Sequence, residues 1–223
     1  MCFSASSSFL ISAVGICSGS YCVSRVNQTN VYDYLPIALT PILFGIQQGL
    51  EGMVWLSLNS ADSQITKTYA FGFLFFSHFL WPFWMTFSVL KVETGETIKK
   101  VLIGLLTIGF LYGVFLYFPL LVNPDWLSVN QVYGSIQYRI HVMSHGIVSP
   151  YLGILLYVML TLLGLMLSSH RGLNYLGGLI FIALIFSQLL FDYALISVWC
   201  FFAAVTSSYL LYFFSSEELF QTS

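Results

Sequence analysis

Seven long apolar stretches fill most of this chain of 223 residues. A helix needs about 20 consecutive apolar residues to cross the hydrocarbon core of a bilayer, and these stretches reach or approach that length. Only 7% of the residues are charged and 58% are hydrophobic, whereas a soluble domain carries about 25% charged residues. The surface of the folded chain must therefore face lipid, and we expect an all-α integral membrane protein.

We predict a single domain over residues 1–223, folded as a polytopic bundle of seven transmembrane helices. The expected spans are Ala5–Ser24, Tyr34–Leu58, Thr68–Leu90, Lys99–Leu121, Ile147–Ser168, Leu173–Phe191 and Ala194–Phe214. The last two form one nearly continuous apolar run, which is twice as long as a bilayer core is thick. We place the necessary turn at Asp192 and Tyr193, because they are the most polar pair in this run.

Lysine and arginine residues assign the sides of the membrane. The first, third and fifth connections hold Arg25, Lys91, Lys99, Lys100 and Arg171, whereas the second and fourth hold Lys67 and Arg139. Because cytoplasmic connections are richer in positive charge, we predict the N-terminus outside and the C-terminus inside. The first stretch lacks the positive start and the cleavage site of a signal peptide, so we expect it to remain as a span.

The connection 122–146 is the longest between the expected spans and contains Trp126, Tyr133 and Tyr138. Tryptophan and tyrosine favour the headgroup level of a membrane. We therefore expect part of this connection to lie along the interface as a short helix.

Three pairs of glycines stand four residues apart inside the expected spans. The pairs are Gly15/Gly19, Gly45/Gly49 and Gly109/Gly113. Small residues at this spacing allow two helix backbones to approach closely, so we interpret these pairs as helix-packing positions.

A few ionisable side chains interrupt the apolar stretches, and they are the candidate functional residues. They are Glu51, His78, His141, His145 and Asp192. An ionisable side chain in hydrocarbon is costly and normally has a partner and a function. Alternating helix directions would place all of them in the outer half of the bilayer, which predicts one shared site on that side.

Local patterns suggest partners for these side chains. Gln47 precedes Glu51 by one helical turn, and Gln188 stands in the same relation to Asp192. Pro82 removes the helical donor to the carbonyl of His78, and such breaks in membrane helices line cavities or ion sites. In the alternative interpretation, a protonated Glu51 makes a structural hydrogen bond, a hydroxyl satisfies His78, and Asp192 lies in a hydrated turn.

Two histidines four residues apart, His141 and His145, can bind one ion from a single helix face; the alternative is a solvated helix start beside Arg139. Three imidazoles and one or two carboxylates suit zinc. We predict His78, His141, His145 and Glu51 as ligands, and Glu51 or Asp192 as the general base for metal-bound water.

The expected activity is therefore a zinc-dependent hydrolase that acts on a lipid or small molecule in the outer half of the bilayer. Three alternatives stay open. An ion- or proton-coupled transporter or channel would use broken helices and acids near mid-membrane, a redox protein would bind haem or quinone, and a non-catalytic membrane binding protein would need no chemistry.

Other classes of function are excluded by composition. A net charge of −2 leaves no large basic face for nucleic acid. The last span has no lysine that could form a Schiff base with retinal. The four cysteines, Cys2, Cys17, Cys22 and Cys200, show no C-x-x-C spacing, and we interpret the last three as small hydrophobic residues.

The opening Met1–Ala5 and the runs Pro41–Gly52 and His141–Gly146 resemble a family of uncharacterised bacterial seven-span membrane proteins that begin with MCFSA. This resemblance covers most of the chain and implies a location in the bacterial inner membrane, without an activity. Seven-span zinc hydrolases of the alkaline ceramidase and adiponectin-receptor type are similar only in parts. Those hydrolases have a serine four residues before a histidine, whereas this chain has Leu74 four residues before His78. Their paired histidines lie in the last span, whereas His141 and His145 lie at the start of the fifth expected span here.

Overall fold

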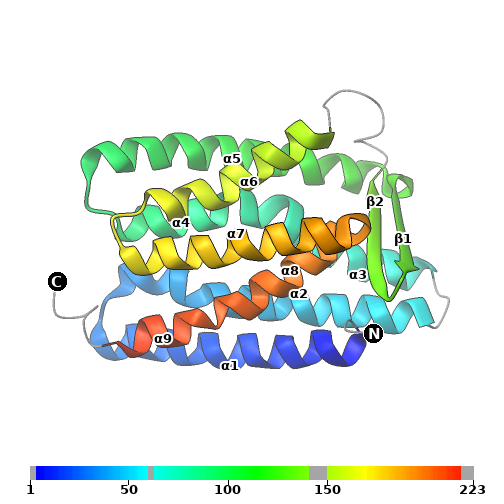
Figure 1. Cartoon of the computed structure of the whole chain (residues 1–223), viewed down its shortest axis with the longest axis horizontal. Coiled ribbons are helices and arrows are strands. Elements are labelled where there is room, and N and C mark those ends of the chain that lie inside the picture. The colour runs from blue at the N-terminus through cyan, green and yellow to red at the C-terminus, as the bar shows by residue number, and fades with distance from the viewer. Residues whose placement is uncertain (1–3, 60–62, 141–149, 217–223) are drawn as a thin grey trace.

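Residues 4–59, 63–140 and 150–216 are described by a computed structural model of the protein. Its helices run roughly along the long axis of the molecule, and a β-hairpin covers the end at which α1 begins (Figure 1). The long helices are α1 (Ala5–Thr29), α2 (Leu35–Asn59), α5 (Glu96–Val122), α6 (Pro150–Leu167) and α7 (Arg171–Phe191). The shorter helices are α3 (Ser63–Leu74), α4 (Trp81–Val92), α8 (Leu195–Ser207) and α9 (Tyr209–Ser215).

Helices occupy the apolar stretches of the sequence wherever the structure describes them. Five are long and apolar enough to cross a membrane: Ala5–Thr29, Tyr32–Leu58, Ser63–Val92, Glu96–Val122 and Arg171–Ser215. The described apolar part of α6, Leu152–Leu167, is shorter. The predicted class, a helical bundle suited to a membrane, agrees with the structure.

The long apolar run at the C-terminal end is divided by a reversal of the chain. A 3₁₀ turn, Asp192–Ala194, separates α7 from α8, and the two helices pack against each other. The indole nitrogen of Trp199 on α8 donates a hydrogen bond to the carbonyl of Ile180 on α7 at 3.3 Å. The predicted turn at Asp192 and Tyr193 is therefore confirmed.

The described part of the long connection after α5, residues 123–140, is mainly a β-hairpin, so the short interfacial helix expected for this connection does not form there. It begins with a 3₁₀ turn, Pro124–Trp126, and continues as antiparallel strands β1 (Leu127–Val132) and β2 (Ser135–Ile140). Tyr133 and Gly134 form the turn with φ angles of 47° and 78°, as two-residue hairpin turns require. Valine, isoleucine and tyrosine in this segment favour strands. The hairpin packs against α3 and α8, and this burial stabilises the strands further.

The glycine pairs lie at close helix contacts, as predicted. A Cβ atom at Gly15 of α1 would stand 2.7 Å from the carbonyl oxygen of Pro41 on α2, and one at Gly45 would stand 2.8 Å from that of Ser12. On α5, a Cβ atom at Gly113 would stand 2.6 Å from the carbonyl oxygen of Phe79. The backbones of these helices touch where a side chain would separate them.

Two connections at the end opposite the hairpin are joined through Glu93, which is 3% exposed. Its carboxylate accepts hydrogen bonds from the backbone nitrogens of Thr94 and Gly95 at 3.0 Å each. It also accepts hydrogen bonds from the backbone nitrogen of Ser169 at 2.9 Å and from its hydroxyl at 2.7 Å. Burial acts to raise the pKa of the Glu93 carboxyl group, but the hydrogen bonds together outweigh it, and the pKa lies below its ordinary value.

Replacing Glu93 with alanine is expected to destabilise the protein by about 2 kcal/mol, because four donors lose a charged acceptor. Since the folded-state pKa is lowered, the stabilisation is complete above the ordinary glutamate pKa and is lost as the pH falls through the folded-state value. Thermal unfolding in detergent at neutral and acidic pH measures both effects. Glu96→Ala is the control, since Glu96 is an exposed residue paired only with Lys99; equal losses in the two variants would contradict the assignment.

Candidate functional site

Glu51 lies in the interior of the bundle between α2 and α8 and is 1% exposed. The Ser197 hydroxyl donates a hydrogen bond to its Oε1 at 2.6 Å, and Gln48 Nε2 donates to its Oε2 at 3.1 Å. No lysine, arginine or histidine in residues 4–59, 63–140 and 150–216 forms an ion pair with this carboxyl group. Glu51 is therefore a buried acid whose partners are neutral.

Gln47 has a different partner from the one that its spacing suggested. The indole nitrogen of Trp81 on α4 donates to Gln47 Oε1 at 2.8 Å, and the Trp81 ring stacks on Phe44 with centroids 4.0 Å apart. Gln48, three residues before Glu51, supplies the amide that binds the carboxyl group. Side chains three or four residues apart both lie close together on a helix, so either glutamine could reach Glu51. Because the buried indole of Trp81 needs an acceptor and Gln47 supplies it, Gln48 is the one that binds Glu51.

His78 lies in a π-helical segment, Phe75–Leu80, that separates α3 from α4. The chain stays helical from Ser63 to Val92, so the irregularity predicted beside His78 takes the form of a π-helical segment and not of a complete break. π-Helical turns are frequent at functional sites. The Nδ1 atom of His78 is hydrogen-bonded to the Ser77 hydroxyl at 2.9 Å, which matches the interpretation that a hydroxyl satisfies the imidazole. A serine and a histidine at this distance can act as nucleophile and base, but no carboxylate of the described residues orients this ring.

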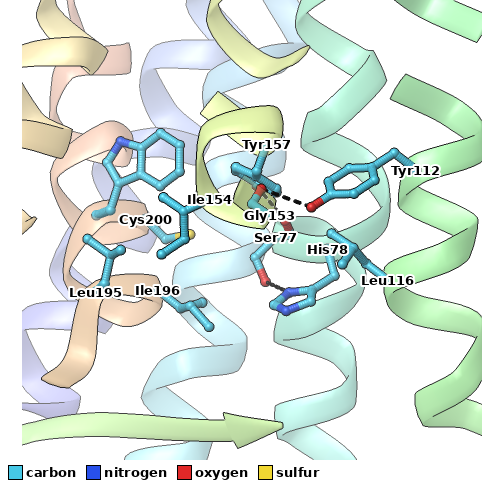
Figure 2. A pocket seen from close by; sticks show the side chains of 11 residues that line it. Ser77, His78, Tyr112, Leu116, Gly153, Ile154, Tyr157, Leu195, Ile196 and Cys200 are labelled. Atoms are coloured by element: carbon cyan, nitrogen blue, oxygen red, sulfur yellow. Dashed lines mark hydrogen bonds between the residues drawn. The ribbon is translucent and has the colours of Figure 1, made fainter. Parts of the chain in front are cut away.

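A cavity of about 200 Å³ lies beside His78, between the π-helical segment, α5, α6 and α8. Figure 2 shows Ser77, His78 and Tyr112 on one side, and Leu195, Ile196 and Cys200 on the other. The Tyr112 hydroxyl donates to the carbonyl of Gly153 at 2.9 Å, and the Tyr157 hydroxyl donates to that of Ser77. Since these hydroxyl groups already have partners, the free surface of the cavity is mainly apolar.

The structure does not bring all the predicted site residues together. Asp192 is exposed in the turn between α7 and α8, where its carboxylate accepts a hydrogen bond from Gln188 Nε2 at 2.9 Å. Glu51 and His78 are both buried, but they share no hydrogen bond. Cys200 borders both groups, because it lines the cavity and lies within electrostatic range of Glu51.

The predicted zinc centre is only partly covered by the structure. His141 and His145 lie outside the described residues. Among the residues that are described, no group of three or more histidine, cysteine, aspartate or glutamate side chains is arranged to hold a metal ion. The zinc ligands and the hydrolase activity therefore stay predictions.

Three residues of these clusters could not be selected from the sequence. Ser197, Trp81 and Tyr157 are a serine and two aromatic residues in a chain rich in both, and serine is common at ordinary helix contacts in membranes. Only their positions opposite Glu51, Gln47 and Ser77 distinguish them.

Comparison with known proteins gives a family but no activity. No curated protein and no solved structure matches the chain. A family of unknown function, DUF6629, matches residues 1–222 and so covers nearly the whole sequence. This agrees with the resemblance to an uncharacterised family, and the chain belongs to the DUF6629 family.

Proposed function

We propose that the protein is a seven-span integral membrane protein of a bacterial inner membrane, with the N-terminus and the hairpin outside. In this proposal it binds an apolar or amphipathic small molecule in the cavity beside His78. One observation carries the proposal: an apolar cavity opens next to a buried imidazole in a π-helical segment. Binding sites of this kind combine apolar walls with a few polar groups that orient the ligand.

The size and chemistry of the cavity define the ligand class. Its volume of about 200 Å³ is below the roughly 300–1,000 Å³ of sites for drug-sized molecules. It therefore takes one ring or the end of an alkyl chain. Leu116 and Leu195 supply apolar contact area, and the imidazole edge of His78 offers a polar contact at one side. The mainly apolar lining favours a non-catalytic binding protein over a hydrolase, because hydrolysis needs a base in contact with water.

Filling the cavity is expected to weaken binding of 4-fluorophenol, a ligand with one ring and one hydroxyl group, at least tenfold, or about 1.4 kcal/mol. The filling variant is Leu116→Trp, because Leu116 lines the cavity from α5. Saturable fluorine NMR shifts of this ligand with the protein in nanodiscs give the affinity. Leu111→Trp is the matched control, since Leu111 is 61% exposed on the same helix and is expected to leave the affinity unchanged. Equal affinities in wild type and both variants would contradict the proposed site.

A further inference from the structure

Buried polar atoms without a partner gather beside Glu51. Gln47 Nε2 has no oxygen or nitrogen acceptor, although Gln47 is fully buried. The orientation of this amide is fixed, because its oxygen accepts from the Trp81 indole, which can only donate. The Cys200 thiol interacts with the Gln47 side chain, but sulfur is only a weak acceptor.

Gln48 supplies the second unpartnered atom, its Oε1. Its Nε2 donates to the Glu51 carboxyl group at 3.1 Å. If the amide were turned over to accept a proton from Glu51, its nitrogen would lose its partner instead. In either orientation one polar atom of the fully buried Gln48 side chain stays unsatisfied.

The third unpartnered atom is the hydroxyl oxygen of Tyr138, which reaches the same region from the hairpin. Tyr138 is 7% exposed and its ring stacks on Phe73 at 4.9 Å. Burial raises the pKa of the Tyr138 phenol well above its ordinary value, and Glu51 and Cys200 act on it in the same direction. Three buried polar groups from α2 and β2 that lack an oxygen or nitrogen partner therefore lie around one carboxyl group.

The chemistry of these atoms selects their occupant. Each unsatisfied buried polar group costs about 1–3 kcal/mol, and proteins commonly satisfy such groups with internal water. An occupant must accept a hydrogen bond from Gln47 and donate one to Gln48. A metal cation cannot accept a hydrogen bond, and a halide anion cannot donate one, whereas water does both.

We propose that Gln47, Gln48 and Tyr138 enclose internal water beside Glu51, and that this hydrated site binds a proton on the Glu51 carboxyl group. The site goes beyond the ligand cavity: Cys200 lines that cavity, whereas Gln47, Gln48, Glu51 and Tyr138 are not among its lining residues. Among the described residues, Tyr138 from β2 and Cys200 from α8 are titratable groups within electrostatic range of Glu51. No charged side chain from the described parts of α1, α3 or α4 pairs with it, so the neutral carboxyl is the less costly form in a hydrocarbon surround.

Infrared difference spectroscopy of the full chain in lipid tests the site. The carbonyl stretch of a protonated carboxyl group is expected in wild type at neutral pH and is expected to disappear in Glu51→Gln. It is expected to persist in Glu96→Gln, in which an exposed carboxylate is removed. Transfer to D₂O is expected to lower its frequency, because water in the site exchanges the proton.

Two further variants probe the enclosure. Tyr138→Phe keeps the ring and removes the hydroxyl, so the band is expected to persist at a changed frequency. Ser197→Ala removes the hydroxyl that donates to Glu51 at 2.6 Å, so it is expected to shift the same band. If Glu51→Gln does not fold, the Ser197→Ala variant still tests whether the band belongs to Glu51. A spectrum in which neither Glu51→Gln nor Ser197→Ala alters a protonated carboxyl band would overturn the proposal. So would a band that D₂O leaves in place, or one that is identical in wild type and Tyr138→Phe.

Discussion

The substitution Gly109→Leu is expected to prevent α5 from packing against α4. Its expected cost is at least about 3 kcal/mol of the free energy of unfolding. A Cβ atom at Gly109 would collide with the carbonyl group of Pro82 and would lie 3.3 Å from the Cα atom of Phe83. These are backbone atoms of α4, so a new side chain cannot be accommodated by a change of rotamer. The helices must separate, and the apolar contacts between them are lost.

The same substitution at Gly104 is the matched control, because the two glycines lie on the same helix. No heavy atom lies within 4 Å of a Cβ atom at Gly104, so Gly104→Leu is expected to change the stability by no more than about 0.5 kcal/mol. Thermal unfolding and monodispersity of both variants in detergent provide the comparison. If both variants unfold at the wild-type temperature, the close contact between α4 and α5 does not exist.

Replacing Glu51 with alanine is expected to cost about 3 kcal/mol. The change leaves a cavity in the core and removes the partner of Ser197 and of Gln48, whose polar atoms are buried. Glu51→Gln keeps the volume and an acceptor for Ser197, so its cost is expected to be about 1 kcal/mol. Unfolding of both variants at neutral pH measures the difference.

A double-mutant cycle separates the hydrogen bond from the cavity. Ser197→Ala combined with Glu51→Ala is expected to cost less than the sum of the single changes, with a coupling of about 1 kcal/mol. Thr86→Ala serves as the unrelated partner, because Thr86 donates to the carbonyl of Leu160 instead. Strict additivity of Glu51 with Ser197 would mean that the 2.6 Å contact contributes nothing.

The helices and their main packing positions could be predicted from the sequence because each depends on local properties. The apolar stretches are long enough to span a bilayer, Asp192 and Tyr193 mark the reversal between the last two, and glycines four residues apart mark close helix contacts. The hairpin was missed, since its aromatic and β-branched residues suit both an interface and a strand. Its conformation depends on burial against α3 and α8.

The sequence also selected Glu51 and His78 as the unusual buried side chains, because an ionisable group among apolar residues is visible without coordinates. It could not say that Gln48 binds Glu51 or that Ser197 completes the pair. These contacts join residues up to 146 positions apart in the chain. For Asp192 it left open a choice between the shared site and a hydrated turn, and the structure places Asp192 in the exposed turn. The preference for lipid or for water is a property of each individual side chain. The sequence alone therefore determined a helical membrane protein with a few polar residues inside its apolar helices. The partners of those residues depend on helix rotation and on the docking of the hairpin, and only the tertiary structure decided them.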